Sequence, residues 1–307
     1  MTLILAVLGR ETIWLMADRR LTSKRNPPRD DARKIMDLET TDGIALLGYA
    51  GLGATARGTE PADWMSAVLR GRPLPIEQSL GVLADAMKRQ LPRHILHIPG
   101  PAAPAHYVLA PAFVNGKSTL YSIDLALTPD RKRFAFRYVR HVNNPTPKSP
   151  PVTPHFGLTG SGALYLASNL GWMPDLRHLV RASDRRRLSP QTVADHLATI
   201  NYQTHLQTSD NSVGPTCIVI WRNRKEGAYR GGGAHSSYTG ITRDSSTPSL
   251  PTIGSGMDIA AIANVLRPLM DEMLKDLMAG NPHKGLDTDK LNKALADVPD
   301  EPDEDLL

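Results

Sequence analysis

The sequence contains a single cysteine, Cys217, among 307 residues. A disulfide framework within the chain is therefore excluded, and nothing argues for an oxidising compartment. No run approaches the roughly 20 apolar residues that a membrane span needs. The opening apolar run, Leu3–Leu8, is too short for a secretory signal and has no basic segment before it. We therefore expect a soluble, cytoplasmic protein that does not engage a membrane.

Aromatic residues are also scarce, at 5% of the chain, which leaves few side chains on which nucleic-acid bases could stack. Clusters of metal ligands are missing as well, since His94 and His97 have no cysteine or carboxylate cluster beside them. No metal and no other cofactor is therefore expected. The 41% of apolar residues still allows a sizeable core, in one large domain with an appendage or in two domains.

Charge is distributed unevenly along the chain, whose net charge is +5. From Met257 onward there are 12 Asp/Glu and 5 Lys/Arg, a net charge of −7, so the remainder carries +12. Such asymmetry fits nucleic-acid binding, or an acidic tail that docks on a basic face of the same or a neighbouring chain. The basic runs Arg131–His141 and Arg185–Arg187 match no nucleic-acid signature, so we interpret them as a solvated strand edge and a loop.

Hydrophobic patterning predicts groups of strands that alternate with pairs of helices. The expected strands are Leu3–Leu8, Thr12–Ala17, two within Lys34–Gly51, His106–Val114, Ser118–Leu127, Phe134–His141 and Thr216–Trp221. The expected helices are Pro61–Arg70, Pro75–Leu91, one within Gly157–Gly171, and Ser189–His205. Many of these strands are apolar on both faces, which predicts two stacked sheets with helices outside. The expected fold of residues 2–222 is therefore α+β, a four-layer αββα sandwich.

The composition changes after Trp221. Residues 223–256 are rich in Gly, Ser, Thr and Pro and predict a linker. Residues 257–307 predict an acidic C-terminal helical extension. It has an apolar stripe along Met257–Ala279, a kink or restart at Pro268, a short helix at Asp287–Ala296 and a disordered end. We expect the stripe to pack within the protomer or on a neighbouring subunit.

Candidate chemistry begins directly behind the start methionine. A tight turn near Arg10 would pair residues whose numbers sum to about 20, so Thr2 would face Asp18 across an antiparallel ladder. Only Met1 precedes Thr2, and its removal would place a hydroxyl and an α-amine on one residue. Such an amine has a pKa of about 7.7–8.0 and can serve as general base for the hydroxyl nucleophile. If Met1 stays, the site is expected to be inactive.

Four residues, including Asp18, could support this nucleophile. The ammonium of Lys34 would lower the pKa of the amine and favour the alkoxide, and Asp18 would hold that ammonium in place. The backbone N–H of Gly48 could stabilise an oxyanion, and Ser161 could relay protons from the start of a helix. Each residue alone also has an ordinary interpretation, as a strand-end ion pair, a surface lysine, a bend or a helix cap.

Taken together, Thr2, "ADRRLT" around Asp18, Lys34, "GYAG" from Gly48 and "GSG" at 160–162 resemble a known family. Residues 2–222 resemble a proteasome β-type subunit, nearer to the bacterial HslV-type and other proteasome-like subunits, in the N-terminal nucleophile (Ntn) hydrolase superfamily. The resemblance implies the Ntn-hydrolase fold and a threonine endopeptidase in a homo-oligomeric ring. It further implies peptide or unfolded-protein substrates and an ATPase unfoldase as partner.

The resemblance also implies how substrate would bind, as a strand added between the segment near Thr22 and the segment near Gly48 and Ala50. The side chains that would line the first specificity pocket are Leu21, Ala32, Met36, Leu46 and Ala50. None of these is charged, which predicts a preference for apolar residues before the cleaved bond.

One further helper is less well matched. The family often has Asp, then Ser three residues later, then Gly, before the last strand. Asp210 fits the first of these positions and Gly214 the last, but Val213 stands where the serine would be.

Other functions stay open. Subunits that only build an assembly keep the fold without activity, and a small-amide hydrolase of the same superfamily would differ only in its substrate. From a different class, a basic nucleic-acid-binding protein with an autoinhibitory acidic tail would show salt-dependent DNA binding. The scarcity of aromatic residues makes us expect no nucleic-acid partner.

Overall fold

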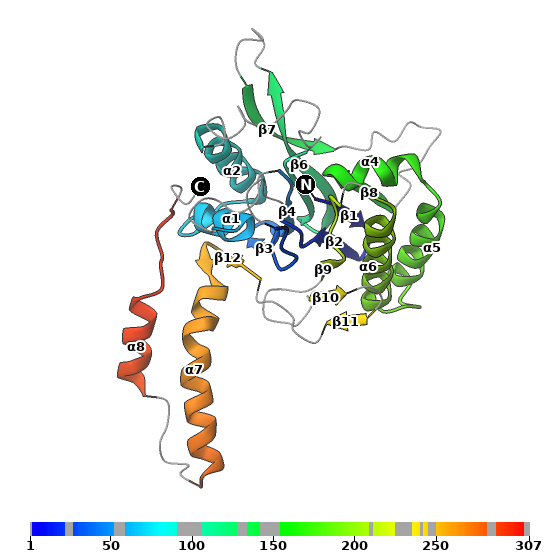
Figure 1. Ribbon diagram of the computed structural model, residues 1–307. Coiled ribbons are helices and arrows are strands. Elements are labelled where there is room, and N and C mark those ends of the chain that lie inside the picture. Colours follow the sequence, from blue (N-terminus) through cyan, green and yellow to red (C-terminus); the bar gives the residue numbers. More distant parts are fainter. Residues whose placement is uncertain are drawn as a thin grey trace.

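The structure is a computed structural model that describes residues 2–21, 27–51, 59–90, 106–127, 134–141, 154–208, 211–224, 235–239, 242–244, 250–280 and 287–303. Over these residues the protein is a mixed α+β structure with two β-sheets (Figure 1). No helix in this part of the chain is long and apolar enough to cross a membrane. His94 and His97 lie outside the described residues.

The first sheet has six strands in the order β11-β10-β9-β2-β1-β8. Their bounds are β1 (Ile4–Leu8), β2 (Thr12–Asp18), β8 (His155–Thr159), β9 (Thr216–Asn223), β10 (His235–Thr239) and β11 (Thr242–Asp244). Neighbouring strands in it are antiparallel. Every residue of β1 and β2 is buried, as the unbroken apolar runs predicted.

The second sheet has seven strands in the order β13-β12-β3-β4-β5-β6-β7. Their bounds are β3 (Ile35–Thr40), β4 (Gly43–Tyr49), β5 (Val108–Val114), β6 (Lys117–Leu127), β7 (Phe134–His141), β12 (Thr252–Gly254) and β13 (Met257–Asp258). β3 to β7 form a continuous antiparallel meander. The sequence predicted each strand of this meander to within three residues at either end.

Helices lie beside both sheets (Figure 1). They are α1 (Pro61–Leu69), α2 (Ile76–Gln90), α4 (Ser161–Ser168), α5 (Trp172–Asp184), α6 (Pro190–Gln207), α7 (Ile259–Met278) and α8 (Thr288–Ala296). The side chain of Ser189 caps α6 by accepting from the N–H of Thr192, and Pro190 follows at the first helical position, as predicted. The sequence analysis missed α5, although Leu176, Val180 and Ser183 give it a buried helical stripe.

Three apolar clusters show how these elements pack. One joins the seven-stranded sheet to α1 and α2, through Leu47, Trp64 and Leu80. A second joins the six-stranded sheet to α5 and α6 and includes every other residue of β1, such as Leu5. The third joins the two sheets and takes the intervening residues of β1, such as Ile4, with Leu46 and Leu109. The alternation of side chains along β1 therefore buries both of its faces.

The register of the first hairpin differs by one residue from the expectation. Ile4 pairs with Ala17, so paired residue numbers sum to 21, and the N–H of Gly9 closes the turn on the carbonyl of Thr12 at 2.9 Å. A four-residue turn is centred between residues 10 and 11, not on residue 10. Leu3 therefore stands opposite Asp18, and the N–H of Asp18 donates to the Leu3 carbonyl at 3.0 Å.

The segment predicted as a linker contains strands that extend both sheets. β10 pairs with β9 in the first sheet, and β12 pairs in parallel with β3 in the second. Ile253 of β12 is fully buried in the cluster between that sheet and α1. The expectation of a simple linker over residues 223–256 was therefore wrong, because pairing with existing strands overrides a Gly/Ser-rich local preference. The division into three domains stays a prediction.

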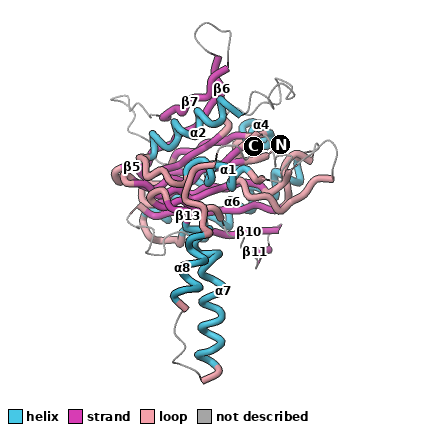
Figure 2. The backbone as a smooth tube through the Cα atoms, turned by 90° about the vertical axis from the view of Figure 1, so that its left-hand side faces the viewer, coloured by secondary structure: helices cyan, strands magenta, loops and turns pink. Residues whose placement is uncertain are grey.

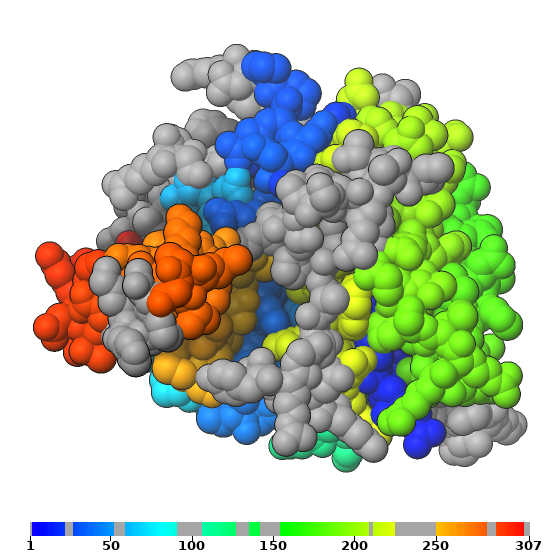
Figure 3. Space-filling view, turned by 90° about the horizontal axis from the view of Figure 1, so that it is seen from below, coloured from blue at the N-terminus to red at the C-terminus, as the bar shows by residue number. Residues whose placement is uncertain are grey.

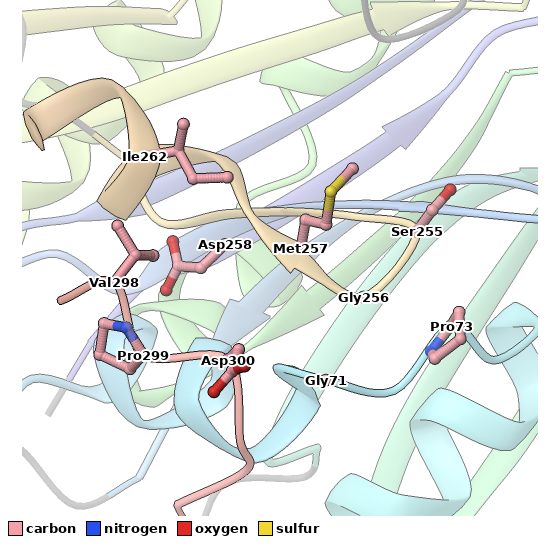
Figure 4. Close-up of a pocket in the computed structure, with 10 residues that line it drawn as sticks. All are labelled: Gly71, Pro73, Ser255, Gly256, Met257, Asp258, Ile262, Val298, Pro299 and Asp300. Carbon is pink, nitrogen blue, oxygen red and sulfur yellow. The ribbon is translucent and has the colours of Figure 1, made fainter. Parts of the chain in front are cut away.

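The C-terminal extension forms a helical hairpin of α7 and α8 that projects from the body (Figures 1 and 2). Pro268 lies inside α7 and does not end it. At the base, Asp258 caps α7 by accepting from Ala261 N–H at 2.9 Å and pairs with Arg70 at 3.4 Å. A pocket at this base is lined by α7, the turn before it and the returning chain (Figure 4).

The chain returns from α8 to the body instead of ending in disorder, as far as residue 303. The N–H of Asp303 donates to the carbonyl of Ala67 in α1 at 3.0 Å. A Cβ on Gly71 would lie 2.4 Å from the carbonyl oxygen of Asp300, so the returning chain packs closely on the end of α1. The predicted disordered end was therefore wrong over these residues, because backbone contacts with the body hold an otherwise acidic segment.

Candidate active site

The structure brings Thr2, Asp18 and Lys34 into direct contact. Thr2 lies just before β1, Asp18 ends β2, and Lys34 directly precedes β3 in the other sheet. The Thr2 hydroxyl donates to Asp18 Oδ1 and accepts from Lys34 Nζ at 2.6 Å. Lys34 Nζ also donates to Asp18 Oδ1 at 2.9 Å and to the Arg20 carbonyl at 2.6 Å. All three residues are buried, with exposed fractions of 3%, 0% and 3%.

Both oxygens of the Asp18 carboxylate accept several hydrogen bonds. Besides Thr2 and Lys34, its Oδ1 accepts from the N–H of Leu3 at 2.8 Å. Its Oδ2 accepts from the N–H groups of Arg20 at 3.0 Å and Gly214 at 3.1 Å. A buried charge is tolerated only when its hydrogen-bonding capacity is met in this way. The one-residue register shift supplies the Leu3 contact and still leaves the Thr2 hydroxyl within reach.

Burial lowers the pKa of Lys34 below its usual value of 10.5, because desolvation penalises the ammonium more than nearby Asp18 stabilises it. A lysine with a lowered pKa is closer to the range in which it exchanges protons near neutral pH. The ammonium also points directly at the Thr2 oxygen, where it would stabilise negative charge. The site thus combines a hydroxyl with a cation suited to its ionisation.

The main chain of Thr2 is held by the start of α4. The N–H of Gly162 donates to the Thr2 carbonyl at 3.2 Å, and the Ser161 hydroxyl donates to it at 3.4 Å. Gly160 adopts a φ of +90°, and a Cβ there would lie 2.1 Å from the Thr2 carbonyl oxygen. Ser161 therefore lies beside Thr2 as expected, although its hydroxyl contacts the main chain of Thr2 and not the Thr2 side chain.

A second ion pair surrounds this group, and the sequence analysis did not anticipate it. Arg20 binds Asp30 through two hydrogen bonds of 2.7 Å, and its Nη1 donates to the Asn211 carbonyl at 3.0 Å. A Cβ on Gly214 would lie 2.8 Å from Asp30 Oδ1, so only glycine fits there. This pair holds the loop that presents the Gly214 N–H to Asp18. Its only signal in the sequence was the pair of aspartates, Asp30 and Asp31, that follows Arg20 by ten residues.

Gly48 lies within β4, paired with Ile35 on one side and Leu109 on the other. Successive N–H groups along an antiparallel strand point to opposite sides. Because Tyr49 donates to the Lys34 carbonyl and Ala50 to the Tyr107 carbonyl, the N–H of Gly48 points towards β5. The expectation that Gly48 stabilises an oxyanion therefore finds no support in this arrangement.

The predicted specificity pocket does not form as a set. Met36 packs in the cluster with α1 and α2, whereas Leu46 and Ala50 pack between the sheets. Met36 and Leu46 thus lie on opposite faces of one sheet, because neighbouring strand positions alternate, and Ala32 is also fully buried. The N–H of Ala50 already donates to Tyr107 at 2.8 Å, so it cannot pair with an added substrate strand.

The remaining predicted residues are placed as follows. Leu21 is partly exposed and pairs with Arg29 through two backbone hydrogen bonds, of 2.8 and 3.1 Å. Thr22 and Asp210 lie outside the described residues. Val213, where the family has serine, is fully buried against the helices on the six-stranded sheet. Neither the pocket at the hairpin base nor a second one beside Arg186, Arg187 and Arg224 includes a predicted site residue.

The solved structures that are similar to this chain include two of Anbu. One is the Anbu (Gly-1) mutant from Hyphomicrobium sp. strain MC1, with 13% identity and a TM-score of 0.45 over 76% of this chain and 88% of that one. The other is the helical assembly of the Anbu complex from Pseudomonas aeruginosa, with 13% identity and a TM-score of 0.44 over 92% and 98%. Anbu is a proteasome-like family of Ntn hydrolases.

No protein-family profile matches the chain, and no curated protein does.

Proposed function

We propose that this chain is a subunit of a proteasome-like assembly, built as a four-layer αββα sandwich, in which Thr2 is the nucleophile of a threonine peptidase. The observation that carries the proposal is the Thr2 hydroxyl, which lies between a buried carboxylate and a buried ammonium. The three apolar clusters, in the order helices, sheet, sheet, helices, support the layered arrangement.

In the proposed reaction, Met1 is first removed, which frees the α-amine of Thr2. The Thr2 oxygen attacks the carbonyl carbon of a peptide bond while its proton passes to that amine. Lys34, 2.6 Å from the oxygen, stabilises the negative charge that develops, and Asp18 keeps Lys34 in place. The peptide C–N bond then breaks, the leaving amine takes the proton, and water hydrolyses the resulting ester of Thr2.

The energetics of the site favour a chemical role over a structural one. Replacing a buried ion pair by well-packed apolar side chains is often neutral or stabilising, so stability alone does not require this pair. The neighbouring strands are otherwise apolar, and an apolar trio at these positions would continue the core. The alternative is a catalytically silent subunit, which the 3% exposure of Thr2 favours, because a covered hydroxyl must be uncovered before a substrate can reach it.

The deciding experiment is intact mass spectrometry of the purified protein before and after an epoxyketone, which needs both the threonine hydroxyl and a free amine. We expect loss of Met1 and one adduct per chain. Thr2→Ala should lose Met1 but gain no adduct, and Thr2→Ser, which keeps a hydroxyl, should retain some labelling. Retained Met1 with no adduct would instead support the silent subunit.

A further inference from the structure

The α7–α8 hairpin presents an apolar face that its own chain leaves uncovered. On α7, Met270, Leu274, Leu277 and Met278 recur at helical spacing and are 42% to 88% exposed. No residue of α7 or α8 is buried. The apolar arc of α7 is therefore wider than α8 covers, and an arc of this kind on a projecting element indicates a contact with another surface.

The net charge of the C-terminal extension limits which partner surfaces the hairpin can bind. The described part of the extension, residues 257–280 and 287–303, contains 10 Asp/Glu and 4 Lys/Arg, a net charge of −6. Two such hairpins would repel each other, and an anionic membrane surface would repel either one. The rest of the chain carries +12, so a second copy of this chain is an electrostatically suitable partner.

In the described part of the body, α4 and α5 carry exposed apolar and basic side chains in the complementary combination. Leu164 on α4 and Leu170 before α5 are 76% and 53% exposed. Arg177, Arg181 and Arg185 follow along the exposed side of α5 and its end, and within the described residues they form no ion pair. We call these five residues the α4–α5 face. Its leucines and arginines match the apolar and acidic character of the hairpin.

The hairpin and the α4–α5 face lie on opposite sides of one molecule. Figure 1 shows α7 and α8 projecting from below α1, whereas α4 and α5 lie at the other side, and Figure 3 shows from below that the hairpin and the region of α5 lie at opposite edges. α7 has 20 residues and is therefore about 30 Å long. A helix that points away from the body cannot reach the α4–α5 face of its own chain.

We propose that the hairpin of one copy docks on the α4–α5 face of a second copy, with Leu274 and Leu277 against Leu164 and Leu170. Because the two surfaces differ, the contact is heterologous and repeats from copy to copy, which gives a closed ring or an open helical array. The proposal deepens the assembly part of the proposed function and names the surfaces that build it.

The test uses two full-length variants and one control, each measured by sedimentation velocity, with circular dichroism as the check on folding. The hairpin variant is Leu274→Asp with Leu277→Asp, and the face variant is Leu164→Asp with Leu170→Asp. The control, Leu206→Asp, changes an equally exposed leucine at the end of α6. We expect wild type and control to sediment as assemblies, and each double variant to sediment as a monomer.

Mixing the two double variants gives the sharpest result. Each retains one intact surface, so an equimolar mixture should form a dimer of one copy of each and nothing larger. This result also shows that both variants are folded. If hairpins instead paired symmetrically with each other, the face variant would stay assembled. That result would overturn the proposal. A monomeric wild type, or a mixture that forms no dimer, would also overturn it.

The outcome is independent of the chemistry at Thr2. Thr2→Ala should sediment like wild type even though it takes no epoxyketone adduct. Loss of labelling and loss of assembly can therefore be told apart.

Discussion

The Thr2 site and the α7–α8 hairpin break the ordinary rules of burial in opposite directions. At the site, the charges of Asp18 and Lys34 are withdrawn from water, whereas on the hairpin large apolar side chains are left in it. Buried charges are costly unless every donor and acceptor is paired, and at Asp18 they are. Exposed apolar stripes have no such internal compensation. The comparison indicates that the Thr2 site serves chemistry within the chain, whereas the α7–α8 hairpin serves association between chains.

The strongest way to break this comparison is to remove the same residue type from both regions. Asp18→Ala leaves Lys34 buried without its counter-ion and removes the acceptor of three N–H groups, so it should lower the free energy of unfolding by about 3–5 kcal/mol. Asp271→Ala, on the exposed hairpin, should change it by less than about 0.5 kcal/mol. Urea denaturation measures both, and similar values for the two variants would contradict the contrast.

Glycine-to-alanine substitutions test how strictly the backbone around Thr2 is held. Gly160→Ala places a Cβ on the Thr2 carbonyl at a φ of +90°, so it should cost about 1–3 kcal/mol of stability and abolish epoxyketone labelling. Gly171→Ala is the matched control, since its φ is −57° and no heavy atom lies within 4 Å of the added Cβ. Labelling that survives in Gly160→Ala would show that Thr2 does not depend on the start of α4.

The lowered pKa of Lys34 predicts a smaller, pH-dependent effect. Between its folded pKa and the unfolded value of 10.5, the unfolded chain binds more protons at this residue, so stability rises with pH across that window. Wild type should therefore gain stability relative to Lys34→Met as the pH rises from neutral towards 10.5. Denaturation at several pH values measures the difference, and a difference that falls with pH would show a raised pKa.

The smallest expected effect on folding is at the hairpin. Leu274→Ser removes an exposed apolar side chain that the folded chain does not bury, so the unfolding free energy should change by less than about 0.5 kcal/mol. A loss of more than about 2 kcal/mol, the size typical of a core leucine, would show that α7 packs on its own chain. Chemical denaturation at a concentration where the protein is monomeric makes this measurement.

The sequence predicted the strands of the central sheets because continuous apolar runs such as Leu3–Leu8 can be buried only on both faces. It also placed Thr2, Asp18 and Lys34 together, because one hairpin and one loop determine their approach. It missed the strands of residues 235–254, whose Gly- and Ser-rich composition favours no regular structure. They form because the edges of existing sheets supply their hydrogen bonds.

The predicted specificity pocket does not form, for a reason that concerns the faces of the sheet. A family resemblance transfers positions along the chain, but the face of the sheet at each position depends on local register. Met36 and Leu46 are suitable apolar residues and point to opposite faces. Pro268 was expected to kink or restart α7; the helix does not restart there, because it runs as one helix from Ile259 to Met278.

The hydrogen bond from Gly214 to Asp18 spans 196 positions of the chain. A ribosome adds roughly 5–20 residues per second, so about 10 to 40 s separate the synthesis of these two residues. During that interval the nascent chain already contains Thr2 and Asp18, but the Asp18 carboxylate lacks the N–H donor of Gly214. The hydrogen bonding of the Asp18 carboxylate is thus completed only when most of the protein has been made.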